Sequence, residues 1–162
     1  MKYIDSEYDY IIVGAGSAGC VLANRLSENP KNRVLLLEAG REDKSITLKM
    51  PAAVLLNLKS TKHNWAFKGE PEPELAGRQL QHDRGKTLGG SSSINGMVFI
   101  RGNSLDYEGW RQMGCEGWGY ADVLPYFKKM ESYSGGGDDF RGDSGPLKAV
   151  SYTHLRAHET SQ

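Results

Sequence analysis

The stretch Tyr8-Asp-Tyr-Ile-Ile-Val-Gly-Ala-Gly-Ser-Ala-Gly19 decides the fold prediction. Its first half is a short β-branched and aromatic run that ends in glycine, which is typical of a buried strand. A helix is predicted over Ser17–Ser27, because its apolar residues follow helical spacing: Ala18, Val21, Leu22 and Leu26. A second strand, almost continuously apolar, is predicted over Arg33–Glu38. The three elements form a βαβ unit, which predicts an α/β, Rossmann-like fold.

Gly14, Gly16 and Gly19 form a G-x-G-x-x-G motif between this strand and this helix. That context is typical of a dinucleotide site. The first glycine allows the tight turn, the second lets the backbone approach a pyrophosphate, and the third lets helix and strand pack closely. Ser17 begins a helix whose free N–H groups face the phosphates. Glu38 ends the second strand, where a carboxylate accepts hydrogen bonds from ribose hydroxyls.

The glycine motif and Glu38 narrow the choice of dinucleotide but do not identify a single one. An acidic Glu38 disfavours a 2′-phosphate, so NADP fits less well than NAD or FAD. NAD and FAD both carry the ADP half that the motif binds. An NAD-dependent dehydrogenase and a non-catalytic dinucleotide-binding fragment therefore remain alternatives to a flavoprotein at this point.

A second glycine cluster is Arg84-Gly-Lys-Thr-Leu-Gly-Gly-Ser-Ser-Ser-Ile-Asn-Gly96. Its Lys86-Thr87 pair suggests a P-loop, but in a P-loop the glycines precede the lysine, and here they follow it. Consecutive glycines and serines bring backbone N–H groups close to a flat or anionic ligand. The cluster therefore predicts a second ligand-contacting segment.

With Phe99, Gly102 and Asp106 downstream, this cluster resembles the first signature of the glucose–methanol–choline (GMC) flavoprotein oxidoreductases. The segment Tyr8–Gly40 is similar to the FAD-binding start of the same family. Three further segments match the family: Asn64-Trp-Ala-Phe67, Ile100-Arg-Gly-Asn103 and Tyr120–Lys129. The resemblance covers residues 8–149 and is strongest to the branch that oxidises choline and related alcohols.

The resemblance implies an FAD cofactor, with the fingerprint glycines and Glu38 at its ADP half. It places six residues near the flavin: Gly89, Gly90, Ser91, Asn95, Gly96 and Met97. Some members carry, just before the Asn, a histidine that bonds covalently to the flavin. This chain has Ile94 there, so non-covalent FAD is expected. A nicotinamide enzyme has no need for this cluster, which favours the flavoprotein.

The family reaction is hydride transfer from an alcohol carbon to the flavin N5, so a small-molecule alcohol is the expected substrate. The sequence does not distinguish oxygen from a quinone as the electron acceptor. The family's base is a histidine near the end of a much longer chain, and no residue here matches it. His63 and His82 are expected to be structural or surface residues. No catalytic residue is assigned, and we expect weak FAD binding and no turnover from these residues alone.

Residues 1–149 are assigned to the N-terminal part of a FAD-binding domain that is incomplete and is expected to expose apolar patches. Residues 150–162 continue no pattern and are similar to a translated sequencing-library adapter, which predicts a non-native tail. The other predicted elements are a short helix after Pro51, a strand over Asn64–Lys68 and an extended connector over Glu70–Glu74. One or two helical turns are predicted within Ser104–Met113, and a helix over Ala121–Met130. The large residues Trp65, Trp110, Trp118, Met113 and Met130 are predicted to pack in a core or lid.

Composition excludes several other classes of protein. The chain of 162 residues carries 20 Lys and Arg against 20 Asp and Glu, which argues against a nucleic-acid binder. It has no run of apolar residues long enough for a transmembrane helix and no signal pattern, so a cytoplasmic location is expected. Cys20 and Cys115 predict free thiols, and the histidines lack metal-ligand spacing. Arg141-Gly-Asp143 is a weak alternative signal for adhesion.

Overall fold

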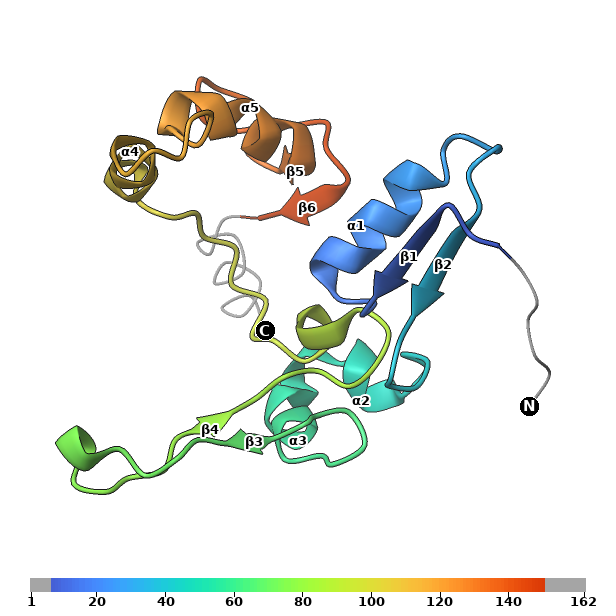
Figure 1. Cartoon of the computed structure of the whole chain (residues 1–162), viewed down its shortest axis with the longest axis vertical. Helices are drawn as coiled ribbons and strands as arrows, with labels where there is room; N and C mark the ends of the chain where they lie inside the picture. The colour runs from blue at the N-terminus through green and yellow to red at the C-terminus, as the bar shows by residue number, and fades with distance from the viewer. Residues whose placement is uncertain (1–6, 151–162) are drawn as a thin grey trace, which may run out of the picture. The chain divides into compact units, whose positions relative to one another are not determined.

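The computed structural model describes residues 7–150, in two compact units that divide between Val98 and Phe99 (Figure 1). The first unit opens with strand β1 (Tyr10–Val13), helix α1 (Ser17–Leu26) and strand β2 (Val34–Leu37). The two strands pair in parallel, with Tyr10 opposite Val34. The βαβ unit predicted from the sequence is therefore confirmed.

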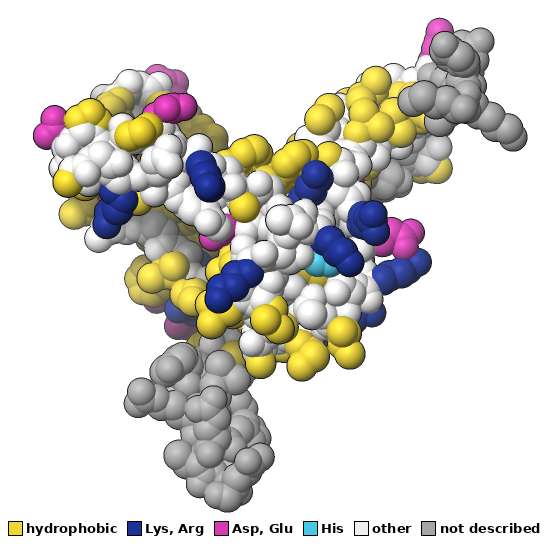
Figure 2. Space-filling model, turned by 90° about the horizontal axis from the view of Figure 1, so that it is seen from below, with side chains coloured by type: hydrophobic (Ala, Val, Ile, Leu, Met, Phe, Trp, Pro, Cys, Tyr) yellow, Lys and Arg dark blue, Asp and Glu magenta, His cyan; other side chains and the backbone are white. Residues whose placement is uncertain are grey.

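The predicted burial of these strands is wrong. In β1 and β2, Ile12 alone is buried, and 82% of Val13 is exposed. Within the described part of the first unit, the sheet has two strands and α1 lies on one face of it, so no other element of that unit covers its opposite face (Figure 1). Figure 2 shows apolar side chains on the molecular surface among Lys and Arg side chains. The expectation of exposed apolar patches is thus confirmed.

Five short helical segments and a hairpin follow in the first unit. Their bounds are α2 at Ile46–Lys49, a 3₁₀ turn at Pro51–Ala53, α3 at Val54–Leu58, β3 at Phe67–Lys68, a 3₁₀ turn at Pro73–Leu75, β4 at Gln81–His82 and a 3₁₀ turn at Gly90–Ser93. The helix expected after Pro51 is confirmed. The strand expected over Asn64–Lys68 is shorter, because the chain turns at Ala66.

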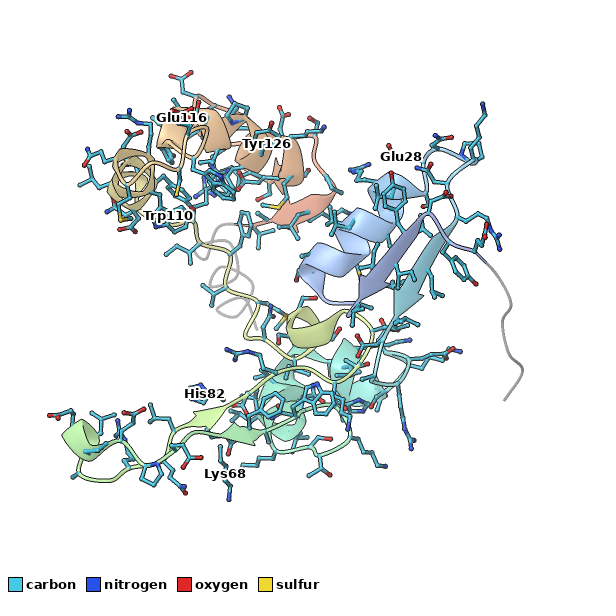
Figure 3. The ribbon with its side chains drawn as sticks, viewed as in Figure 1. Glu28, Lys68, His82, Trp110, Glu116 and Tyr126 are labelled. Atoms are coloured by element: carbon cyan, nitrogen blue, oxygen red, sulfur yellow. The ribbon has the colours of Figure 1, made fainter. Side chains whose placement is uncertain are left out.

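The β3–β4 hairpin forms a long arm that extends from the first unit (Figure 1). Lys68 and His82 lie on its two strands and point to opposite sides in Figure 3. The extended connector predicted over Glu70–Glu74 is wrong in its second half. Pro73 starts a 3₁₀ turn there, because its fixed φ suits the first helical position.

The second unit contains two helices and a small parallel sheet: α4 at Ser104–Gln112, α5 at Tyr120–Met130, β5 at Glu131–Tyr133 and β6 at Leu147–Ala149. Asn103 caps α4 by accepting the Leu105 N–H at 2.9 Å. The Tyr107 ring packs against Trp110, Tyr120 and Phe127, which joins the two helices. Trp110 on α4 and Tyr126 on α5 are labelled in Figure 3.

Among the described residues of the second unit, Glu131 carries a fully buried charge. Its Oε1 accepts a hydrogen bond from Arg141 Nη1 at 2.7 Å, and its Oε2 accepts one from Arg101. The arginine of the Arg141-Gly-Asp143 tripeptide is therefore engaged inside the unit, which disfavours the adhesion interpretation.

The large side chains predicted to pack in a core or lid are not in a core. The exposed fraction of these five residues lies between 38% and 75%: Trp65, Trp110, Trp118, Met113 and Met130. Cys20 and Cys115 are free thiols, as predicted, and the structure places both on the surface. The suspected tail lies outside the described residues except for Val150.

Candidate functional site

The turn between β1 and α1 has the geometry that its glycines predict. Gly14 has φ +95°, a left-handed conformation that side chains disfavour. A Cβ added at Gly19 would lie 1.9 Å from the Gly14 carbonyl oxygen, so only glycine lets helix and strand pack this closely. A Cβ at Gly16 would meet no atom within 4 Å, so the space in front of it is open. The turn therefore offers bare backbone at the N-terminus of α1.

Glu38 follows β2 and ties this turn to the next loop. Its Oε2 accepts the Ala15 N–H at 2.8 Å, and its Oε1 accepts the Gly40 N–H at 2.7 Å. Each carboxylate oxygen keeps a second lone pair that a ribose hydroxyl can use. The sequence indicated the ribose role, whereas this structural role depends on contacts that the spacing does not reveal.

The second glycine cluster lies directly against the first. The Gly89 N–H donates to the Ala15 carbonyl oxygen at 2.7 Å. A Cβ at Gly90 would lie 2.9 Å from the Cα of Gly16. Thr87 is fully buried, and its Oγ1 donates to the Arg41 carbonyl oxygen at 2.8 Å. Two stretches far apart in the sequence thus meet backbone to backbone within the first unit.

An open cleft of about 620 Å³ runs along this meeting point. Its volume lies within the range of small-molecule sites. The lining residues are Val13, Gly14, Gly16, Leu37, Glu38, Ala39, Trp65, Phe67, Arg84, Gly85, Gly90 and Ser91. The cleft therefore combines open backbone, one carboxylate, one guanidinium and two aromatic rings.

The structure brings together part of the predicted cofactor set. Gly14, Gly16, Glu38, Gly90 and Ser91 line the cleft. Gly19 and Gly89 do not line it but contact its turn, Gly19 at the Gly14 carbonyl and Gly89 by its hydrogen bond to Ala15. Other members lie elsewhere. Ser17 begins α1 without lining the cleft, Asn95 and Met97 line a separate cavity of about 100 Å³, and Gly96 lines neither.

Two aromatic side chains in the cleft wall were missed by the sequence analysis. The rings of Trp65 and Phe67 stack at 5.7 Å with an interplanar angle of 8°. Lys86 Nζ lies 4.1 Å from the centre of the Trp65 ring, a cation–π contact. In an extended strand, their spacing of two residues would place both rings on one side. The chain turns at Ala66 instead, so this spacing alone does not predict their stacking.

The carboxyl group of Asp83, directly after β4, has a shifted pKa. Hydrogen bonds from the side chains of Asn64 and Gln81 hold the pKa of Asp83 below its usual value.

Within residues 7–150, no group of His, Cys, Asp and Glu side chains is arranged to hold a metal ion. Among those same residues, no helix is long and apolar enough to cross a bilayer.

Comparison with known proteins agrees with this geometry. The family model described as GMC oxidoreductase matches residues 8–161. An oxygen-dependent choline dehydrogenase of Vibrio vulnificus (strain YJ016) is 54% identical over 144 residues, which cover 89% of this chain and 26% of that protein. Another from Sinorhizobium fredii is 52% identical over 139 residues, covering 86% of this chain and 25% of the relative.

Solved structures show the same similarity. Pyridoxine 4-oxidase from Mesorbium loti matches with a TM-score of 0.82 and 39% identity, over 88% of this chain and 28% of that enzyme. An FAD-dependent oxidoreductase from Chaetomium thermophilum matches with a TM-score of 0.75 and 31% identity, over 89% of this chain and 26% of the other.

The chain belongs to the GMC oxidoreductase family. It has the start of that family's α/β, Rossmann-like FAD-binding domain, so the fold class predicted from the sequence is confirmed. The chain spans about a quarter of the length of the curated relatives that it matches.

Proposed function

We propose that this chain forms the part of a flavoprotein that binds the ADP half of FAD. The observation that carries the proposal is the cleft in which Gly16 and Gly90 lie side by side. Its features fit the group: open space in front of Gly16, the N-terminus of α1, and a carboxylate at the end of β2. The family and its FAD-dependent neighbours support FAD rather than NAD.

Each cleft residue has a role in this proposal. The backbone at Gly14 and Gly16 approaches the pyrophosphate, and the free N–H groups of α1 stabilise its negative charge. Glu38 orients the ribose through its remaining lone pairs. Trp65 and Phe67 offer an apolar ring face to the bound nucleotide, and Arg84 adds a positive charge.

The segment around Asn95, Gly96 and Met97 is proposed to lie near the flavin ring. Ile94, which stands where some relatives carry the linking histidine, is 3% exposed. We propose non-covalent FAD for this reason. FAD modification occurs in a neighbour, the formate oxidase of Aspergillus oryzae RIB40, 31% identical with a TM-score of 0.73 over 90% of this chain, so the linkage needs its own test.

Acid denaturation of the whole protein provides that test. Non-covalent FAD leaves with the supernatant, which then carries the yellow absorbance while the precipitated polypeptide is colourless. Flavin that stays with the washed precipitate would contradict the non-covalent assignment.

The whole protein is proposed to oxidise a small alcohol, of the choline type or another primary alcohol. The similarity to oxygen-dependent choline dehydrogenases supports this substrate class. Bound FAD would supply the hydride acceptor. The residues described here bind and orient the cofactor, and none of them is assigned as the base. The rest of the protein must provide it.

The proposal is tested by titrating the apo form of the whole protein with FAD and, in parallel, with NAD. We expect saturable quenching of flavin fluorescence by the protein and no displacement of FAD by NAD. A whole protein that takes up NAD and leaves FAD free would overturn the flavoprotein assignment.

A further inference from the structure

The two strands of the hairpin arm continue toward the cleft, but their pairing is interrupted there. Phe67 pairs with His82, Lys68 with Gln81, and farther in Asn64 pairs with Gly85. Between these pairs lies Ala66, with φ +47°, a left-handed conformation that a residue with a Cβ adopts at a cost. The ladder therefore has a defect two residues long on each strand, with Trp65 and Ala66 facing Asp83 and Arg84.

The side chain of Asn64 fills this defect. Its Oδ1 accepts the backbone N–H groups of Ala66 and Arg84, each at 3.0 Å. Its Nδ2 donates to the Leu58 carbonyl oxygen at 2.6 Å and to Asp83 Oδ1 at 2.7 Å. Asn64 is 2% exposed, and its amide is fully hydrogen-bonded.

The defect lies at the cleft wall. Trp65 and Phe67 flank Ala66, and Arg84 and Gly85 lie on the facing strand. All four line the cleft, whereas Asn64 itself does not. Without the Asn64 amide, two partly buried backbone N–H groups would lose their acceptor, and the chain would have to rearrange to satisfy them.

We propose that Asn64 is a positioning residue for the FAD cleft. Its amide holds the ladder defect in the one conformation that turns the Trp65–Phe67 pair and Arg84 toward the bound nucleotide. This inference rests on the proposed function, because the wall positions a ligand only if the cleft binds one.

The hydrogen-bond pattern requires an amide rather than a carboxylate at this position. In Asn64→Asp, the oxygen that replaces Nδ2 would face the Leu58 carbonyl and the Asp83 carboxylate, to which Nδ2 now donates two hydrogen bonds. Asp83→Asn keeps an acceptor oxygen for Asn64. The double variant exchanges the two groups, so that the amide at position 83 donates to the carboxylate at position 64 and the pair forms again. The Leu58 carbonyl still lacks its donor there, so the recovery is partial.

The experiment compares the FAD dissociation constants of the whole protein and these three variants. We expect Asn64→Asp to bind FAD about tenfold more weakly or worse, Asp83→Asn to bind like the parent, and the double variant to recover part of the loss. Asn32→Ala is the matched control. It removes a similar amide-to-carbonyl bond, Nδ2 to the Leu26 oxygen at 2.8 Å, away from the cleft. It should lower the melting temperature and leave FAD affinity unchanged.

The possible outcomes separate the two proposals. Parent-like FAD affinity in Asn64→Asp, or no recovery in the double variant, would overturn the positioning role alone. An equal loss of FAD affinity in Asn32→Ala would also overturn it, since general destabilisation would then account for the effect. A parent that binds no FAD would overturn the proposed function and the positioning role with it.

Discussion

At the residue scale, the glycines of the first turn separate folding from binding. A Cβ at Gly19 would clash with the Gly14 carbonyl, whereas a Cβ at Gly16 would point into open space. The same substitution at the two positions should therefore act on different properties of the protein. A motif that is written as one pattern contains a packing position and a ligand position.

Gly19→Ala should destabilise the fold. The new methyl would overlap the Gly14 carbonyl, and the helix would have to shift from β1. We expect a loss of roughly 1–3 kcal/mol in the free energy of unfolding, typical of overpacking. Urea denaturation measures this loss. An unfolding free energy equal to that of the parent would show that the helix–strand contact is looser than the structure indicates.

Glu38 provides a second prediction at this scale. Glu38→Ala leaves the Ala15 and Gly40 N–H groups without their acceptor, which costs about 1–3 kcal/mol for each group that stays buried. Glu38→Gln keeps one acceptor oxygen and should lose less stability. We expect the urea midpoint to be highest for the parent, lower for Glu38→Gln and lowest for Glu38→Ala. Identical midpoints for the two variants would contradict it.

At the element scale, the sequence predicted β1, α1 and β2 because their signals are local: an apolar run, helical spacing and glycines at fixed offsets. The pairing of β5 with β6 was missed, because three-residue strands joined by the loop 134–146 have no such pattern. Asn64 was missed for a related reason. Its four hydrogen bonds join segments between residues 58 and 84, and only the fold brings them together.

The second unit depends on Glu131 at the start of β5. Replacing it with Gln removes the charge that Arg101 and Arg141 share, and Arg101 remains mostly buried. Breaking a buried ion pair in this way costs about 3–5 kcal/mol. We expect Glu131→Gln to make the region around residues 131–149 sensitive to limited proteolysis. Parent-like resistance to protease would contradict this role.

The stability contributed by Asp83, next to the β3–β4 hairpin, should decrease in acid. Hydrogen bonds from Asn64 and Gln81 lower the pKa of Asp83, so its contribution to stability is complete above the unfolded value and is lost as the pH falls through the folded value. In Asp83→Asn that part of the pH dependence disappears. Urea midpoints of parent and variant, measured from neutral pH down to about pH 3, should therefore converge as the pH falls. Parallel curves would contradict the linkage.

At the scale of the whole molecule, the described residues are proposed to form half of a cofactor site, and the sheet beside it has only two strands. The apolar residues of β1 and β2 remain exposed, for example Val13 at 82%. The sequence predicted that the two glycine clusters share a crevice because together, though not singly, they are specific to one family, and the family is confirmed. It could not predict that Asn95 and Met97 would line a separate cavity, because their placement depends on how the chain turns after Ser93.

The most direct measurement is the FAD dissociation constant of the whole protein carrying Gly16→Ala, with its urea midpoint as the control. A methyl at this position meets nothing in the protein but stands where the nucleotide phosphates are proposed to lie. We predict an unchanged midpoint and FAD binding weakened by about tenfold or more. Unchanged FAD affinity in this variant would contradict the proposal that the two glycine clusters form a dinucleotide cleft.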